Sequence, residues 1–283
     1  MRVLVFLVSF IIFSLNNAFS QHEVGVAIGL STYQGDLAPD NIQGSIGNLH
    51  AAFGALYRYN VNKFIAGKLG FTYGRLSADD ADSEAPSKQR RNLSFRSTIL
   101  EASLTVEWNI LGYQPYNYTR VFSPYVFAGV AGFKYNPKAF YDNAWVELQP
   151  LGTEGQFIED FSDRAPYKLI QVSFPVGFGV KYALTDQWNI GLEAGLRVTL
   201  TDYIDDVSTA YVSATELTAS SGELAAQLAN RTGVDVQPGS QRGNAENNDT
   251  YLIGMLFISY NISDNGLVGG RSRNKRKSGC RTY

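Results

Sequence analysis

The stretch Ile170–Leu200 reads IQVSFPVGFGVKYALTDQWNIGLEAGLRVTL, and bulky apolar residues occupy every second position of two successive runs within it. These residues are Val172, Phe174, Val176, Phe178, Val180 and Tyr182, followed by Trp188, Ile190, Leu192, Ala194, Leu196, Val198 and Leu200. The residues between them are small, polar or charged. Because successive side chains of a strand point to opposite faces, each run predicts a strand with one apolar face. Roughly ten such residues suffice for a tilted strand to cross a bilayer.

A soluble β-sandwich also alternates, but it does not place bulky apolar groups at six or seven successive outward positions. The sequence therefore favours membrane strands, which must close into a barrel because every backbone polar group in lipid needs an internal partner. Eight segments read as strands, near 23–33, 50–60, 64–77, 96–110, 124–135, 169–183, 187–201 and 249–260. The prediction is an all-β fold, an antiparallel transmembrane β-barrel of about eight strands.

The chain divides into three parts. Residues 1–20 have the pattern of a signal peptide, with Arg2, an apolar run from Val3 to Phe13, and a small-x-small cleavage site at 18–20. A membrane anchor helix is the weaker interpretation, because the apolar run is short. Residues 21–262 form the predicted barrel, and 263–283 a short basic tail. Export combined with alternating strands predicts the outer membrane of a diderm bacterium.

The connections between predicted strands alternate in length. The turns at 60–63 and 184–187 are tight, whereas four connections, at 34–49, 78–92, 136–168 and 202–248, are long. Outer-membrane barrels have short periplasmic turns and long external loops. We therefore expect both chain termini, and the C-terminal tail, in the periplasm. The long external loop at 213–248 includes a possible short helix within 215–231.

Charged residues occur on the inward face of several predicted strands. They are Arg58, Lys68, Glu101, Glu107, Lys181, Glu193 and Arg197. An eight-stranded barrel is just wide enough for side chains to fill it, and buried charges must pair, so these residues predict an ion-pair network in the lumen. A proton or ion path is the alternative. The inward faces of the first, fifth and eighth predicted strands are left unassigned because these strands alternate less cleanly. In the fifth strand, the run at 126–132 is apolar on both faces.

The sequence contains no pattern of catalytic, metal-binding or nucleotide-binding residues. Its two histidines, His22 and His50, lie far from any such motif, although His50 could meet loop carboxylates at the outer rim. The acidic loop at 79–84 fits a solvated loop better than a calcium site. Cys280 is the single cysteine and has no internal disulfide partner. We expect no enzyme, no cofactor, no nucleic-acid partner and no small-molecule substrate.

Four segments resemble one family more than barrels in general. They are 30–37 (LSTYQGDL), 122–133 (FSPYVFAGVAGF), 148–156 (LQPLGTEGQ) and 195–211, which includes TDYIDDVS at 201–208. Together they look like the PorG-like outer-membrane barrels of Bacteroidota. The resemblance spans about 22–260, and the runs at 148–156 and 201–208 are its more specific parts.

That resemblance implies a component of the type IX secretion system, which supports protein transport and often gliding motility. The partners it implies are outer-membrane lipid and a periplasmic ring made of a lipoprotein and its partner protein. Two groups of residues are candidates for partner binding, one in the run at 201–208 and one in the tail. They are Asp202, Tyr203, Asp205 and Asp206, and Arg271, Arg273, Lys275, Arg276 and Lys277. A stand-alone small barrel for adhesion or envelope integrity is the alternative.

Overall fold

The computed structural model describes residues 21–39, 42–115, 117, 119–161 and 164–262. The predicted signal peptide at 1–20 and the predicted basic tail at 263–283, with Cys280, lie outside the described residues.

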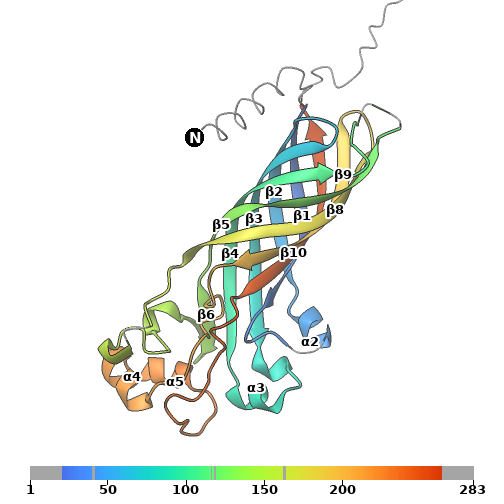
Figure 1. The fold of residues 1–283 in the computed structure, drawn as a ribbon. Coiled ribbons are helices and arrows are strands. Elements are labelled where there is room, and N and C mark those ends of the chain that lie inside the picture. The colour runs from blue at the N-terminus through green and yellow to red at the C-terminus, as the bar shows by residue number, and fades with distance from the viewer. Residues whose placement is uncertain (1–20, 40–41, 116, 118, 162–163, 263–283) are drawn as a thin grey trace, which may run out of the picture.

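Eight strands of the described chain form a closed antiparallel barrel (Figure 1). They are β1 (Gln21–Gln34), β2 (His50–Asn60), β3 (Ile65–Asp79), β4 (Ser94–Asn109), β5 (Phe122–Lys134), β8 (Ile170–Ala183), β9 (Trp188–Thr199) and β10 (Thr250–Asn261). Neighbours in the chain are neighbours in the barrel, and β1 pairs with both β2 and β10. The predicted fold class and the eight predicted strands are confirmed, with strand ends that differ by at most two residues.

The outer wall of the barrel is an apolar belt. On β8 the side chains from Val172 to Tyr182 alternate between exposed apolar residues and buried or half-buried small and polar ones, as the sequence predicted. Leu100, Leu104, Val106 and Trp108 are likewise exposed on β4. Exposed apolar side chains around a closed barrel are the mark of a wall in contact with lipid, and the chain is a small barrel of the outer-membrane kind. None of the helices in the described residues has the length and hydrophobicity of a membrane-spanning helix.

The structure assigns the facing of the three strands that the sequence left open. On β1, Glu23 is buried in the lumen and Val24, Val26 and Ile28 are exposed. On β5 and β10 the inward side chains include Tyr125, Phe127, Phe133, Tyr251 and Phe257, all buried. These strands look apolar on both faces because aromatic rings fill the lumen.

The four long connections gather at one end of the barrel, opposite the tight turns (Figure 1). We call this assembly the loop cap and define it as 35–49, 80–93, 135–169 and 200–249. Its helices are α2 (Ile42–Gly47), α3 (Pro86–Arg91), α4 (Ala214–Ser221) and α5 (Glu223–Ala229), with short 3-10 turns η2 (Asp80–Asp82), η3 (Gln149–Leu151) and η4 (Glu159–Phe161). The largest buried apolar cluster, which includes Tyr33, Phe95, Phe133 and Ile204, lies where the barrel meets this cap.

A hairpin in the cap was not predicted from the sequence. Strands β6 (Pro137–Tyr141) and β7 (Ala144–Glu147) continue the sheet from the outer end of β4. Asp142 and Asn143, between them, have positive φ angles of 45° and 61°. Two residues of this kind with left-handed backbone are a hairpin-turn signal, so the sequence signal was the Asp-Asn pair between Phe140-Tyr141 and Ala144-Trp145.

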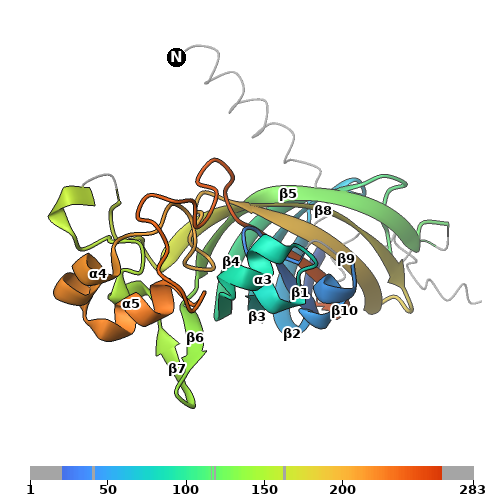
Figure 2. The ribbon, with the colours of Figure 1, turned by 90° about the horizontal axis from the view of Figure 1, so that it is seen from below.

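The possible helix within 215–231 forms as two helices, α4 and α5, separated by Gly222 with φ 90°. Leu217, Ala225 and Leu228 are buried against the cap. Seen along the barrel from the cap end, the two helices lie to one side of the barrel and do not cover its mouth (Figure 2). Leu228 packs with Ala139 of β6, which ties the helices to the hairpin.

Candidate functional site

The structure brings all seven predicted charged lumen residues into one barrel interior and pairs each of them. Glu107 lies at the centre, with its carboxylate 2.9 Å from Arg58 Nε and 2.8 Å from Lys181 Nζ. Lys68 Nζ lies 2.5 Å from Glu193 Oε2 and 3.6 Å from Glu107 Oε1. Alternation along five strands, β2, β3, β4, β8 and β9, directs these side chains toward one another, since every second residue of each strand points inward.

Arg197 and Glu101 form a second pair toward the cap end. Arg197 Nε lies 3.3 Å from Glu101 Oε2, and Arg197 Nη1 donates to the carbonyl of Gly195. Tyr251 donates a hydrogen bond of 2.7 Å to Glu101, and Tyr125 one of 2.8 Å to Glu193. Tyrosine hydroxyls from β5 and β10 therefore replace part of the hydrogen bonding to water that these carboxylates lose on burial.

Glu23 is the lumen residue that the sequence analysis missed. Its Oε1 lies 2.5 Å from Arg58 Nη1, and both side chains are fully buried. With Glu23, four cations face four carboxylates in the lumen, so the interior charge is balanced. The signal was present in the sequence, because Val24, Val26, Ile28 and Leu30 alternate with Glu23 and three small residues.

Aromatic rings fill the remaining lumen. A Cβ added at Gly177 of β8 or at Gly195 of β9 would lie 2.7 Å from Phe127 Cζ, so glycine is needed where this ring crosses the interior. The cavity between Ala27, Lys68, Phe127 and Arg197 has a volume of about 30 Å³. That volume is close to the space of a single water molecule. The interior is a plug of paired charges and rings.

A second polar cluster lies in the loop cap around Glu154. Its carboxylate accepts hydrogen bonds from the backbone N–H of Ser208 and Thr209 and from the Thr209 hydroxyl, and it lies 2.8 Å from Arg242 Nη1. Gly152 and Gly155 flank the Thr153–Glu154 pair with φ angles of 58° and 81°. This left-handed backbone turns the pair inward, which explains the glycine spacing of the run at 148–156.

Asp206 joins the same cluster from the run at 201–208. Its carboxylate accepts hydrogen bonds of 2.6 Å from the Thr153 hydroxyl and from the Tyr167 hydroxyl. Asp206 itself has φ 69°, a left-handed conformation that aspartate tolerates better than most residues. The two sequence runs that carry the more specific part of the family resemblance thus pack directly against each other.

Asp205 and Asp249 share one tyrosine. Tyr33 Oη lies 2.7 Å from Asp205 Oδ2 and 2.5 Å from Asp249 Oδ1. A hydroxyl has a single proton to donate, so the second contact requires a proton on one of the carboxyl groups. Burial raises the pKa of both Asp205 and Asp249 well above the usual aspartate range, in agreement with this geometry.

Burial also raises the pKa of the neighbouring carboxyl groups. It raises the pKa of Asp206 to about 6, although the positive charge of Arg242 opposes the shift. It raises the pKa of Asp202 to about 7. Burial disfavours the charged form of a carboxyl group, and hydroxyl and N–H donors compensate only in part. Asp202 and Asp206 therefore take up protons closer to neutral pH than an ordinary aspartate does.

Arg91 connects three parts of the cap. It makes a two-point contact with Asp80, with Nη2 2.7 Å from Oδ1 and Nε 2.8 Å from Oδ2. The same guanidinium donates to the backbone carbonyls of Asp36 and Arg242. Bidentate arginine–carboxylate contacts are geometrically specific, so Arg91 fixes the relative positions of these loops.

The candidate partner-binding residues of the run at 201–208 are held inside the cap. Asp202, Asp205 and Asp206 are buried, and Tyr203 is half-buried and stacks on Tyr167 with ring centroids 4.9 Å apart. In this arrangement Asp206 and Tyr203 contact other residues of the cap, and Asp205 contacts Tyr33 at the end of β1. The candidates in the tail, from Arg271 to Lys277, lie outside the described residues.

The remaining polar positions considered from the sequence have local partners. His50 contacts Ser77 at 2.5 Å between Nε2 and Oγ, at the end of β2. In the acidic loop at 79–84, Asp80 forms an ion pair with Arg91, and Asp79 accepts a hydrogen bond from the N–H of Ala81. Within the described residues, no group of three or more His, Cys, Asp or Glu side chains is placed to hold a metal ion.

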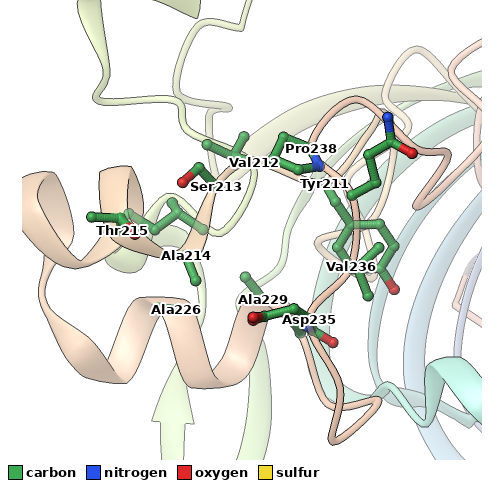
Figure 3. Close-up of a pocket in the computed structure, with 13 residues that line it drawn as sticks. Tyr211, Val212, Ser213, Ala214, Thr215, Ala226, Ala229, Asp235, Val236 and Pro238 are labelled. Carbon is green, nitrogen blue, oxygen red and sulfur yellow. The ribbon is translucent and has the colours of Figure 1, made fainter.

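A pocket of about 440 Å³ lies between the two helices α4 and α5 and the segment 235–238 (Figure 3). Tyr211, Val212, Ala229 and Pro238 line it with mixed apolar and polar surface. It lies in the part of the cap formed by the longest connection.

Comparisons with known proteins bear on the family and the fold. A family model described as a domain of unknown function (DUF6089) matches residues 1–218. No curated protein matches the sequence significantly.

Several solved structures of outer-membrane and surface proteins are similar to this chain at low sequence identity. Ail, the attachment invasion locus protein of Yersinia pestis, is 11% identical with a TM-score of 0.38, over 86% of this chain and 97% of that chain. Neisserial surface protein A is 8% identical with a TM-score of 0.39, over 86% and 97%. The outer membrane protein OprG of Pseudomonas aeruginosa is 11% identical with a TM-score of 0.36, over 86% and 94%.

Proposed function

The chain belongs to the DUF6089 family, and we propose that this member is a structural and assembly subunit of the type IX protein secretion system. In this role the barrel anchors the machine in the outer membrane. A periplasmic ring lipoprotein and its partner protein bind it from the side of the tight turns.

The observation that carries this proposal is the contact between the two family-like runs. Glu154, from the run at 148–156, accepts hydrogen bonds from Ser208 and Thr209, and Thr153 donates to Asp206. The residues that carry the resemblance to PorG-like barrels therefore lie in a packed part of the loop cap, where residues distant in sequence contact each other. Generic strand alternation would give a resemblance in the barrel wall alone.

The lumen supports a structural role over transport of solutes through the barrel. Its four cations are paired with four carboxylates, and the cavity among them holds about 30 Å³. An assembly subunit needs a rigid wall and exposed end surfaces, both of which such a plugged barrel provides.

The test is secretion by a strain that lacks the gene. We expect export of the substrates of the secretion system to stop while permeability of the envelope to small dyes remains near normal. Complementation with the full chain should restore export. Complementation with a chain that lacks 271–283 should weaken co-purification of periplasmic proteins, and the remaining attachment should fall with salt, because exposed charges are screened over about 10 Å at 0.1 M.

The outcomes separate the alternatives. Normal secretion in the deletion strain would discard the secretion-subunit proposal and leave a stand-alone barrel for adhesion or envelope integrity. Normal co-purification by the tail-less chain would discard only the tail's part in partner binding. In each complemented strain, folding of the barrel is verified by the change in its electrophoretic mobility on heating.

A further inference from the structure

A group of unbalanced positive charges lies on the outer face of the barrel, where the apolar belt ends on β3, β4 and β5. Arg75 of β3 is exposed and pairs in register with Thr98 of β4. Arg96 lies two residues before Thr98 in β4, on the same outward face. Lys134, exposed at the end of β5, pairs with Leu100 on the other side of Thr98. Three cations therefore surround one exposed threonine.

These charges have little local compensation. Among the described residues, Arg75 and Lys134 form no ion pair within 4.0 Å, and neither does Arg96. The nearby Lys138 of β6 is neutralised by Glu147 of β7, at 2.8 Å. Arg75 and Arg96 are diagonal neighbours on one sheet face, and like charges in this relation repel each other, so their arrangement costs stability unless an anion joins it.

Arg96 is positioned to bind a phosphate. Its guanidinium lies over the ring of Trp145, with Cζ 3.6 Å from the ring centroid. Stacking holds the guanidinium plane still and leaves the N–H groups at its edge free to donate. A pre-oriented arginine fork matches two oxygens of a phosphate group. The Thr98 hydroxyl adds a donor between the three cations.

The position of these three cations on the barrel indicates which ligand they bind. Leu100 is 57% exposed and Ile170 is 68% exposed, and both flank Lys134 in the last row of the apolar belt. Cations that begin where lipid-facing residues end lie at the level of lipid headgroups. Trp145 and Phe140 are both exposed, and their ring centroids are 5.3 Å apart. Aromatic residues are enriched at the membrane–water interface, so this pair fits the same level.

We propose that Arg75, Arg96, Lys134 and Trp145, which we call the basic patch, bind the phosphate of a phosphorylated glycolipid in the membrane leaflet at the cap end. The three cations supply charge, Arg96 supplies geometry, and the adjacent apolar belt takes the acyl chains. This binding would hold the β6–β7 hairpin and the cap against the membrane surface. The inference goes beyond the proposed secretion role and does not depend on it.

The test is a titration of the purified full chain in mixed micelles with phosphorylated lipid A, with the bound lipid counted by native mass spectrometry. The test variant is R75Q/R96Q/K134Q. The control variant, K63Q/R90Q/R120Q, removes the same charge outside the basic patch. We expect binding at least tenfold weaker in the test variant and changed less than twofold in the control. Dephosphorylated lipid A should bind the unaltered chain as weakly as phosphorylated lipid A binds the test variant.

Two further measurements keep the proposal open to refutation. R96K keeps the charge and loses the fork, so its affinity should lie between those of the unaltered chain and the triple variant. A photo-reactive residue in place of Thr98 should capture lipid in native membranes. The proposal is overturned if the test variant binds within twofold of the unaltered chain, or if dephosphorylated lipid A binds equally well. Capture of a protein at position 98, or equal binding of inorganic phosphate alone, would also overturn it.

Discussion

The lumen and the loop cap both bury acidic side chains, but they stabilise them by different means. In the lumen, four carboxylates face four cations, and Glu107 alone contacts three of them. In the cap, carboxyl groups outnumber the cations, and Asp205, Asp206 and Asp249 depend on tyrosine and threonine hydroxyls and on backbone N–H groups. Ion pairing fixes a permanent charge, whereas hydroxyl donors leave a buried carboxyl group able to take up a proton.

This difference suits the two surroundings. A lumen enclosed by lipid has little water to stabilise an unpaired charge, so each carboxylate needs a cation. The cap is built from loops in contact with water at its surface, where polar side chains can relax. Substitutions that disturb one region at a time should therefore affect the stability of the lumen and of the cap differently.

The largest effect is expected from Glu107→Gln. The change leaves Arg58 and Lys181 buried beside a neutral amide, and breaking a buried pair from one side costs about 3–5 kcal/mol. Urea unfolding in lipid vesicles measures this loss. The matched control is Glu147→Gln, which removes a carboxylate from an exposed pair with Lys138 and should cost no more than about 1 kcal/mol. Similar losses for the two variants would contradict the paired-lumen account.

A charge placed on the barrel wall should have the next largest effect. Leu192 of β9 is 56% exposed on the apolar belt, and an arginine near the middle of the membrane costs about 2–4 kcal/mol. Val234 in the cap is 67% exposed, yet Val234→Arg should change stability by less than about 0.5 kcal/mol because it faces water. The same vesicle unfolding assay compares them. An equal loss in Val234→Arg would place the cap residue in lipid.

Within the cap, Glu154→Gln should loosen the loops without unfolding the barrel. The amide loses the charge-assisted contact with Arg242 and part of the set of bonds to 208–209, a local cost of about 1.5–3 kcal/mol. Limited proteolysis should cut the cap faster while the heat-modifiable mobility of the barrel stays unchanged. Glu159→Gln, an exposed acid in the same connection, is the control. Unchanged protease resistance in Glu154→Gln would remove Glu154 from the centre of the cap.

The barrel was largely predictable from the sequence and the cap was not. Strand alternation is a local property, so the facing of Val172 or Leu104 needs only its neighbours in the chain. Alternation did not give the facing of β5 and β10, because Phe127 and Phe257 fill the lumen and make both faces of these strands apolar. Glu154 and Arg242 are 88 residues apart and meet through turns with no period. Their pairing depends on left-handed backbone at Gly152 and Gly155, which spacing alone does not reveal.

The smallest expected effect is a response to pH that occurs only in the cap. The pKa of Asp202 is raised to about 7 and that of Asp206 to about 6, above the usual aspartate value near 3.8. A folded state with raised carboxyl pKa values binds more protons than the opened loops do. Its stability against opening therefore rises as the pH falls through about 7 toward 5, and is lowest above pH 8.

Hydrogen exchange of the barrel in lipid, measured by mass spectrometry at pH 8 and pH 5.5 and corrected for the intrinsic exchange rate, tests the comparison most directly. We predict that peptides covering 200–210 and 148–156 gain protection at pH 5.5, by a change in opening free energy on the order of 1 kcal/mol. Peptides of β4 and β8, which carry Glu107 and Lys181, should exchange equally at both values. Protection lost from the cap on acidification, or gained equally in both regions, would contradict the account.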